Sequence, residues 1–161
     1  MRVLWAPWRM AYVGGPKAGG CIFCNALATQ DLRSALALLQ RPAIVMLNRF
    51  PYASGHLMVA PQRHVADLSV LPPEEFQVLM SAVQRAATLL ADAYHPQGMN
   101  ISVNLGAAAG AGVADHLHWH IVPRWHGDTN FMPMLADVRV IPEHLAATYD
   151  RLRPIFAPPG E

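Results

Sequence analysis

The chain has 161 residues, of which 53% are hydrophobic and 14% are charged, and its formal net charge is +1. This composition is typical of a globular protein with a buried core and excludes a disordered chain. The small net charge, without any block of like charges, argues against a protein that binds nucleic-acid polymers through a broad basic face. No apolar run approaches the roughly 20 residues of a membrane span, and Pro7 and Arg9 interrupt the start before a signal-peptide core forms. We therefore expect a cytoplasmic protein with neither a membrane nor a nucleic-acid polymer among its partners.

The chain contains two cysteines, Cys21 and Cys24, in a Cys-x-x-Cys arrangement. A disulfide between them would close too short a loop to stabilise the fold much. In a cytoplasmic chain the pair indicates either a metal site or a redox pair. The 20 residues before it are rich in glycine, proline and aromatic residues, and they predict an extension in which Trp5 and Trp8 contact either the core or a ligand.

A hairpin and three helices are predicted from the apolar pattern. The continuous apolar run 43–48 suits a buried strand, and after a turn the run 56–60 suits its antiparallel partner. Between residues 72 and 94 apolar residues recur every three and four positions, which predicts one long amphipathic helix. A shorter helix is expected from 142 to about 153, and a turn with a short helix from 21 to 30.

Two stretches of alternating residues predict further strands. Over residues 99–105 apolar side chains alternate with Asn and Ser, as on a strand with one core face and one polar face. After a loop of mostly glycine and alanine at 106–112, the alternation returns as His-Leu-His-Trp-His-Ile at 116–121. Strands combined with one long helix and a C-terminal helix indicate an α+β fold with an antiparallel sheet. Residues 1–161 show no internal repeat, so we expect a single domain.

Three histidines at alternate positions, His116, His118 and His120, are the sharpest feature of the sequence. On a strand they share one face at intervals of about 7 Å. Imidazole titrates near neutral pH, so one ring can attack a substrate while its neighbour donates a proton. The spacing alone leaves two other interpretations open: a polar outer face that happens to be rich in histidine, and a three-histidine metal site.

The segments before the histidines carry candidate phosphate contacts. Gly110, Ala111 and Gly112 have small side chains, and we expect their backbone N–H groups to approach an anion closely. Asn104, on the polar face of the preceding strand, can donate an amide hydrogen bond to phosphate, although a turn role is the alternative. His126 is close enough in sequence to approach the site. We nevertheless expect four histidines to be structural or solvated instead of catalytic: His56, His95, His126 and His144.

The run His116-Leu117-His118-Trp119-His120-Ile121-Val122 resembles the His-φ-His-φ-His-φ-φ motif of the histidine-triad (HIT) superfamily, where φ is hydrophobic. The order of the surrounding segments agrees over roughly residues 21–131. These segments are LNRFP at 47–51, GHLMVAP at 55–61, the long helix, NLG at 104–106 and Pro-Arg at 123–124. The opening LWAPWRM at 4–10 and the segment 123–131 look most like the Fhit-related bacterial branch, which includes diadenosine polyphosphate hydrolases and phosphorylases.

The resemblance implies a layout and a mechanism. It places a HIT-like core at 21–135, between an N-terminal extension at 1–20 and a C-terminal helix and tail at 136–161. His118 would attack the α-phosphate of a nucleotide to form a covalent nucleotidyl-histidine, which water or inorganic phosphate would then release. His120 would hydrogen-bond the phosphate or the departing group. The amide of Asn104 and the loop N–H groups would stabilise the developing charge, and Asn48 would hold the ribose.

The cysteine pair also has a place in this resemblance. Family members that carry Cys-Ile-Phe-Cys, as here at 21–24, often bind a structural zinc. The resemblance assigns Cys21, Cys24, His64 and His116 as its ligands. Two sulfur and two nitrogen ligands would make a closed tetrahedral site, which is structural rather than catalytic. The alternative is two ordinary thiols and a surface histidine, and no organic cofactor is expected.

The type of reaction stays open at this point. Many relatives carry Gln, Ser or Thr in the loop just before the triad, whereas this chain has Ala111-Gly112-Val113-Ala114. The leading hypothesis is a nucleotidyl hydrolase or phosphorylase that cleaves dinucleoside polyphosphates. The alternatives are a nucleoside phosphoramidase or other nucleotidyl transferase, and a nucleotide-binding sensor with slow turnover. Relatives of this branch form homodimers through the long helix and adjacent strands, so we expect a homodimer.

Overall fold

The computed structural model of the chain describes residues 19–128 and 143–157. The predicted extension, with Trp5 and Trp8, lies outside the described residues except for positions 19 and 20. The boundary predicted at residue 135 lies outside them as well. The division into extension, core and tail therefore stays a prediction.

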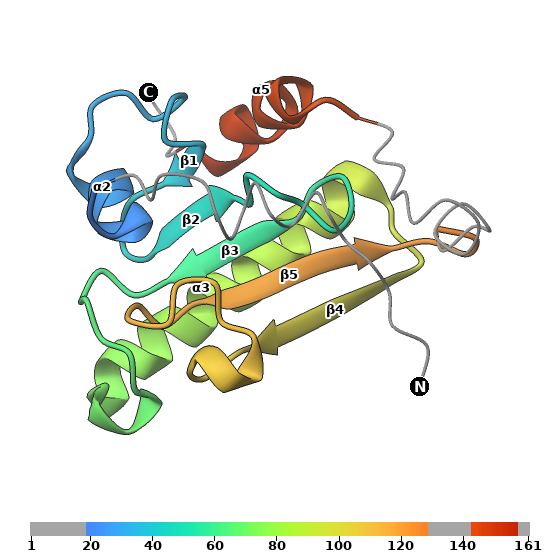
Figure 1. Ribbon diagram of the computed structural model, residues 1–161. Helices are drawn as coiled ribbons and strands as arrows, with labels where there is room; N and C mark the ends of the chain where they lie inside the picture. The colour runs from blue at the N-terminus through green and yellow to red at the C-terminus, as the bar shows by residue number, and fades with distance from the viewer. Residues whose placement is uncertain (1–18, 129–142, 158–161) are drawn as a thin grey trace.

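The described residues form one antiparallel sheet of five strands, in the order β1-β2-β3-β5-β4 (Figure 1). The strands are β1 (Ala37–Leu39), β2 (Ile44–Leu47), β3 (Leu57–Ala60), β4 (Gly98–Val103) and β5 (Trp119–Arg124). The α-helices of this part of the chain are α2 (Ile22–Ala28), α3 (Pro73–Tyr94) and α5 (Leu145–Phe156), and short 3-10 turns lie at Leu68–Val70 and Ala107–Ala109. The predicted α+β fold, with its antiparallel sheet, long helix and C-terminal helix, is confirmed. Strand β1 was not predicted, because three residues are too few to show a periodic pattern.

Strands β2 and β3 are buried on both faces. They pair as the predicted hairpin, with Val45 opposite Val59. Alternate residues face two different apolar clusters. One cluster contains Val45, Leu47, Leu57 and Val59 with α3, and the other contains Ile44, Met46, Met58 and Ala60 with α2. Burial on both faces explains why these strands appear in the sequence as continuous apolar runs.

Helix α3 covers one face of the sheet (Figure 1). A proline in its first turn suits the start of a helix, and it ends at His95, whose backbone is left-handed. Its buried residues follow the expected spacing of three and four: Leu79, Ala82, Val83, Ala86 and Leu90. The predicted helix is confirmed, although Phe76 at its start is 36% exposed.

Strand β4 is less buried than its alternating pattern predicts. Ile101 and Leu105 are about half exposed, and Met99 and Val103 are only partly buried. The predicted core face is therefore present only in part, because β4 is the edge strand of the described sheet, with β5 on one side only. Its side chains therefore reach beyond the centre of the sheet that α3 covers.

Strand β5 begins at Trp119, so His116 and His118 precede the strand instead of lying on it. The pairing of β5 with both of its neighbours stops at Trp119. The N–H of Leu117 instead donates to the carbonyl of Val65 at 2.6 Å. The alternation still holds, because Leu117 and Trp119 pack in the cluster with α3 and the histidines face the other side.

Helix α5 begins three residues later than predicted. The side chain of His144 caps it by accepting the N–H of Ala146 at 3.2 Å. Tyr149, Leu152 and Phe156 then pack against α3 and β1. On the opposite face of β2 and β3, the short helix α2 confirms the helix expected within residues 21–30.

Candidate active site and metal centre

The three histidines lie inside the protein, on the face of the sheet opposite α3. His116 is fully buried, His118 is 3% exposed and His120 is 8% exposed. His120 lies between Met58 on β3 and Ser102 on β4. Burial of this degree excludes the interpretation of a solvated outer face that happens to be rich in histidine.

His118 has one tautomer available to it. Its Nδ1 lies 2.8 Å from the carbonyl oxygen of His116, which only accepts, so Nδ1 carries the proton. Nε2 therefore holds a lone pair. Burial lowers the pKa of His118 below its ordinary value, which favours the neutral ring near pH 7. A neutral imidazole with an unprotonated Nε2 is the nucleophilic form of the side chain.

His120 has the opposite tautomer, and His56 fixes it. The backbone N–H of Tyr52 donates to Nδ1 of His56 at 3.1 Å, so His56 carries its proton on Nε2. Nε2 of His56 lies 3.0 Å from Nδ1 of His120 and donates to it. His120 therefore carries its own proton on Nε2. Burial and then the neighbouring His118 lower the pKa of His120 to about 4, so the ring is neutral near pH 7.

His56 thus has a structural role, one of the two expected for it, and it lies inside the site. It is 1% exposed, and its ring centroid lies 5.1 Å from that of His120. The available signal was its place at the start of an apolar strand, because a buried imidazole needs a polar partner. The ring of Tyr52 lies beside the pair, 4.8 Å from His56 and 6.3 Å from His120.

Four potential metal ligands meet at the N-terminal end of α2: Cys21, Cys24, His64 and His116, with all ligand atoms within 4.8 Å of one another. Sγ of Cys21 lies 3.2 Å from Nδ1 of His116, and Sγ of Cys24 lies 3.3 Å from Nδ1 of His64. The two Nδ1 atoms are 3.2 Å apart. A tetrahedral zinc ion would hold nitrogen and sulfur ligands about 3.6 Å apart and two nitrogen ligands about 3.3 Å apart. The structure brings together the four predicted ligands, at distances that fit one tetrahedral ion.

His116 is oriented toward this cluster and away from the other two histidines of the row. Its Nε2 lies 2.9 Å from the carbonyl oxygen of Pro61 and donates to it, so the lone pair on Nδ1 faces the sulfur atoms. Among the described residues, neither His118 nor His120 belongs to a group of three potential metal ligands. The interpretation of one ion held by all three histidines is therefore excluded.

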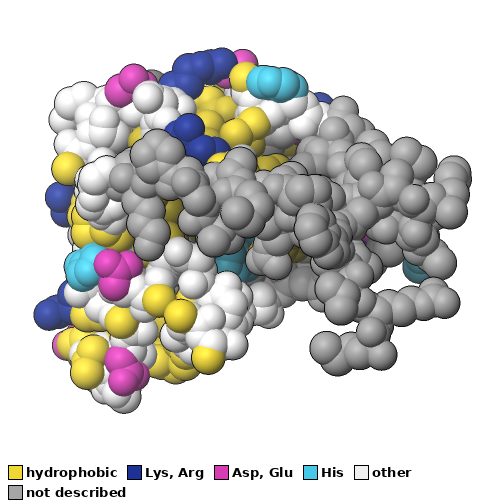
Figure 2. Space-filling view, viewed as in Figure 1, with side chains coloured by type: hydrophobic (Ala, Val, Ile, Leu, Met, Phe, Trp, Pro, Cys, Tyr) yellow, Lys and Arg dark blue, Asp and Glu magenta, His cyan; other side chains and the backbone are white. Residues whose placement is uncertain are grey.

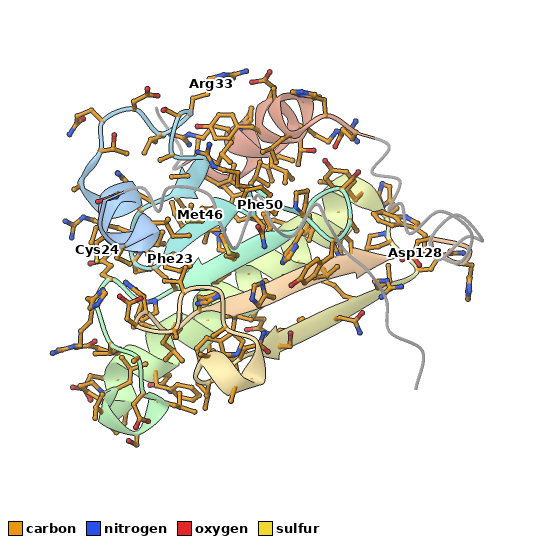
Figure 3. The ribbon with its side chains drawn as sticks, viewed as in Figure 1. Phe23, Cys24, Arg33, Met46, Phe50 and Asp128 are labelled. Atoms are coloured by element: carbon orange, nitrogen blue, oxygen red, sulfur yellow. The ribbon has the colours of Figure 1, made fainter. Side chains whose placement is uncertain are left out.

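An apolar ring separates the metal cluster from His118. Phe23 of α2 is fully buried, and its centroid lies 4.9 Å from that of His116 and 5.0 Å from that of His118. Figure 3 shows Phe23 and Cys24 on α2, with Phe23 toward Met46 of the sheet. No role was predicted for Phe23. Its position between two candidate metal ligands was the signal that could have drawn attention to it.

Asn48 follows β2 beside His56. Its backbone N–H donates to the carbonyl of His56 at 3.0 Å, and its side-chain Oδ1 accepts the N–H of Phe50 at 2.9 Å. The turn therefore occupies the amide oxygen, and Nδ2 is the group that can donate to a ligand. The predicted ribose contact stays a prediction.

The loop before the histidines is closed by its own hydrogen bonds. The N–H of Gly110 donates to Ala107 at 3.0 Å, and the N–H of Ala111 donates to Gly106 at 3.3 Å. These two amides, which we expected to meet a phosphate, would have to give up those bonds to do so. The N–H of Gly112 makes no such bond within the described chain.

Asn104 lies against this loop. A Cβ placed on Gly110 would be 3.9 Å from Nδ2 of Asn104. Gly110 has a positive φ of 88°, a conformation that favours glycine. Asn104 and Gly110 are therefore neighbours in space, as the predicted phosphate site requires.

The other histidines lie elsewhere. His126 is exposed, two residues beyond the end of β5. His95 ends α3, and His144 caps α5. The expectation that these three are not catalytic agrees with their positions.

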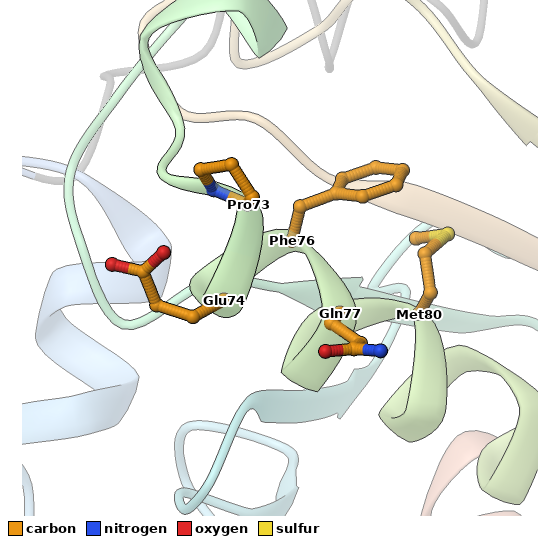
Figure 4. A pocket seen from close by; sticks show the side chains of 5 residues that line it. All are labelled: Pro73, Glu74, Phe76, Gln77 and Met80. Atoms are coloured by element: carbon orange, nitrogen blue, oxygen red, sulfur yellow. The ribbon is translucent and has the colours of Figure 1, made fainter.

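Two surface hollows also lie away from the histidine row. One is at the start of α3 and is lined by Pro73, Glu74, Phe76, Gln77 and Met80 (Figure 4). The other lies between α3 and the β1–β2 edge and is mostly apolar, with Phe156 in its wall. Neither hollow contains a histidine or a cysteine.

Basic and acidic side chains are interspersed on the face of the molecule shown in Figure 2. In the described part of the chain, none of the helices has both the length and the apolar character needed to cross a membrane.

Comparison with known proteins places the chain in a family. A model of the HIT domain family matches residues 34–127. The AP-4-A phosphorylase of Mycobacterium tuberculosis is 36% identical over 154 residues, which cover 90% of this chain and 79% of that protein. The protein hit of Bacillus subtilis is 32% identical over 108 residues, which cover 67% and 73% of the two chains.

The solved structures agree with the sequence comparisons. The crystal structure of a Zn-bound histidine triad family protein from Mycobacterium smegmatis matches with a TM-score of 0.66 and 28% identity. The match covers 85% of this chain and 93% of the other. The family match over residues 34–127 includes the whole histidine row, Asn48 and Asn104. The chain belongs to the HIT domain family.

Proposed function

We propose that this protein is a nucleotidyl hydrolase or phosphorylase that cleaves dinucleoside polyphosphates, with His118 as the nucleophile. The observation that carries the proposal is the pair of opposite tautomers, an unprotonated Nε2 on His118 beside a protonated Nε2 on His120. Their ring centroids are 4.9 Å apart, so both atoms can reach one phosphate group. The name and the 36% identity of the mycobacterial AP-4-A phosphorylase support the substrate class.

The first step follows from these two atoms. Nε2 of His118 attacks the α-phosphorus, so a P–N bond forms and the P–O bond to the rest of the polyphosphate breaks. The bond electrons leave on that oxygen, and the N–H of His120 donates a hydrogen bond to it or to a phosphate oxygen. Asn104 and the loop at 106–112 contact the remaining phosphate oxygens, and Asn48 contacts the ribose.

The second step determines whether the enzyme is a hydrolase or a phosphorylase. Water attacking the phosphorus of the nucleotidyl-histidine would release a nucleoside monophosphate, and inorganic phosphate would release a nucleoside diphosphate. Either attack breaks the P–N bond and returns the electron pair to His118. The 36% identity to a protein named AP-4-A phosphorylase supports phosphate as the acceptor here.

We also propose that Cys21, Cys24, His64 and His116 hold one zinc ion. The ligand distances fit a tetrahedral site, and the mycobacterial structure with 28% identity is described as Zn-bound. Two sulfur and two nitrogen ligands leave no open position, so the ion would stabilise the fold and take no part in the reaction.

A homodimer is the third part of the proposal. Strand β4 lies at the edge of the described sheet, and Ile101 and Leu105 expose apolar surface there. Phe76, beside Trp119 of β5, adds a partly exposed apolar side chain on α3. A second copy that pairs with β4 about a two-fold axis would continue the sheet and cover this surface.

The experiment is incubation of the purified protein with diadenosine tetraphosphate, with and without inorganic phosphate, beside a His118→Ala control. ADP and ATP that appear only with phosphate would establish a phosphorylase, and AMP with ATP from water alone would establish a hydrolase. Adenosine phosphoramidate serves as a parallel substrate. Cleavage of that compound alone would replace the proposal by a phosphoramidase, and tight binding with no turnover of either compound would replace it by a sensor.

A further inference from the structure

Seven aromatic rings form a continuous row through the site. Successive ring centroids along it are 4.8 to 5.1 Å apart, in the order His64, His116, Phe23, His118, His120, His56, Tyr52. The first two rings belong to the metal cluster, and the fourth and fifth belong to the proposed reaction. In this row, Phe23 lies between the two groups.

Phe23 holds a fixed place in this row. It is fully buried, and it packs with Ile44, Met46, Met58 and Ala60 of the sheet. Its plane is tilted by 44° to that of His116 and by 35° to that of His118. Offset and tilted ring pairs at this distance attract each other. The position of Phe23 is therefore linked to both histidines.

The ring comes from a short helix whose N-terminal end carries two of the proposed metal ligands. Helix α2 has seven residues, and a helix this short is marginal without tertiary contacts. Cys21 occupies the position before its first residue and makes no side-chain capping bond, and Cys24 lies in its first turn. A metal ion bound to both sulfur atoms would fix this turn against His116, with Phe23 between the two ligands in sequence.

The other side of His118 is already held. Its Nδ1 donates to the carbonyl of His116, and its ring meets that of His120 at 73°. These contacts leave the face toward α2 to be fixed by Phe23. Loss of the ring would open space in which the imidazole of His118 turns or exchanges its hydrogen bond for one to water.

We propose that Phe23 is the positioning residue of the nucleophile. Its ring packs between His116 and His118, so a metal ion that holds α2 in place also holds His118 in place. This inference rests on the proposed function, in which His118 attacks the substrate. Phe23 itself touches no reacting atom. The zinc site then has a catalytic effect even though the ion takes no part in the reaction.

The test compares Phe23→Leu and Phe23→Met with Phe156→Leu. Phe156 is also fully buried, but it lies at the end of α5 in the other apolar cluster, so its variant controls for the loss of one core ring. We expect Phe23→Leu to keep bound zinc, to leave KM within about twofold and to lower the single-turnover rate about tenfold, because small displacements of a reacting group cost this much or more. Phe23→Met, which keeps more of the volume, should recover part of the rate. Phe156→Leu should lose stability and keep its rate.

A nitrogen NMR spectrum of the imidazole rings, recorded without substrate, gives a second measurement. Wild type should show His118 as a single tautomer with the proton on Nδ1, and Phe23→Leu should show a mixture of tautomers. If Phe23→Leu keeps both the wild-type rate and the single tautomer, the inference is wrong. If wild-type protein cleaves no nucleotide at all, the proposed function fails, and the NMR comparison still decides whether Phe23 positions His118.

A double-mutant cycle tests the link to the metal. Cys24→Ser should release zinc and lower the single-turnover rate by about the same tenfold as Phe23→Leu. If both act through the ring, the double variant should be no slower than the single ones, since coupled residues are not additive. A hundredfold loss in the double variant, or an unchanged rate in Cys24→Ser, would overturn the proposed transmission.

Discussion

Nε2 of His56 lies 3.0 Å from Nδ1 of His120, and both residues are buried, at 1% and 8% exposed. Because the N–H of Tyr52 occupies the other nitrogen of His56, this contact fixes both rings in one tautomer each. The position of the proton on His120 is thus determined through His56 by the main-chain N–H of Tyr52.

Replacement of His56 should therefore impair the reaction without removing any group that touches the substrate. We expect His56→Ala to lower kcat roughly tenfold to a hundredfold, because the proton of His120 is then no longer held on Nε2 and can move to Nδ1. It should also lower the free energy of unfolding by about 1–3 kcal/mol, since Nδ1 of His120 loses its buried partner. Steady-state kinetics and urea unfolding measure the two effects. His56→Gln, which restores a donor near Nε2, should recover part of kcat, and equal losses in both variants would contradict this assignment.

The low pKa of His120 predicts how stability depends on pH. Burial lowers its pKa from the model-compound value of 6.5 to about 4, so between these values the unfolded chain binds the proton and the folded chain does not. The free energy of unfolding should then fall as the pH drops from about 6.5 to about 4, by up to roughly 3 kcal/mol from this residue. Urea unfolding at several pH values should show a shallower dependence for His120→Gln than for wild type. Parallel curves for the two proteins would contradict the shifted pKa.

Removal of the metal should loosen α2. We expect one zinc ion per chain by elemental analysis, and a fall in the unfolding temperature on treatment with a strong chelator. A loss of about 2 kcal/mol would correspond to roughly 4–8 °C for a domain of this size. Cys24→Ser should unfold at the lower temperature and be insensitive to the chelator. A chelator effect of equal size on Cys24→Ser would mean that the ion is bound elsewhere.

Glu143 should stabilise the attachment of α5. Its carboxylate accepts hydrogen bonds from Tyr94 and Thr148 and pairs with Arg151 at 2.7 Å, and its side chain is 17% exposed. Burial and this carboxylate raise the pKa of Tyr94 to about 12, in agreement with a phenol that donates. Glu143→Ala should cost about 1–3 kcal/mol of unfolding free energy in urea, because partly buried donors lose their acceptor. Asp67→Ala, at an exposed carboxylate that caps a short turn, is the control and should cost less.

The dimer can be tested at the edge of the sheet. Ile101→Glu places a charge on the exposed side of β4 and should convert a dimer into a monomer in sedimentation or light-scattering measurements. Ile155→Glu on α5 is the matched control, because Ile155 is also partly exposed but lies on another element. Monomeric wild-type protein, or dissociation by both substitutions alike, would contradict the proposed interface.

The parts of the fold that were predictable are those with a local pattern. The stripe from Leu79 to Leu90 predicts α3 because its period belongs to one helix, and the two apolar runs predict the hairpin β2–β3. The exposure of Ile101 was not predictable in this way, because alternation shows that a strand has two different faces and does not show what covers them. The late start of β5 depends on where its partners end, which the local sequence does not contain.

In the site, too, contacts between segments distant in sequence could not be predicted from a local pattern. The metal cluster joins Cys21 to His116 across 95 residues, and only the resemblance to a family connected them beforehand. The pairing of His56 with His120 arises from the register between β3 and β5, which no pattern within either strand determines. Phe23 had no assigned role because a phenylalanine in an apolar segment is most often part of a core, which it also is.

The burial of β2 and β3 on both faces has a consequence for folding. In most sheets a shift of one residue moves apolar side chains into water, so burial itself selects the correct alignment. Here a shifted β3 would exchange one apolar cluster for another, and burial would discriminate poorly between the two arrangements. Polar contacts at the end of the strand do discriminate, because a shift would separate His56 from His120 and from the amide of Tyr52. The contacts that fix the tautomer of His120 thus also favour the native alignment of β3 over the alignment shifted by one residue.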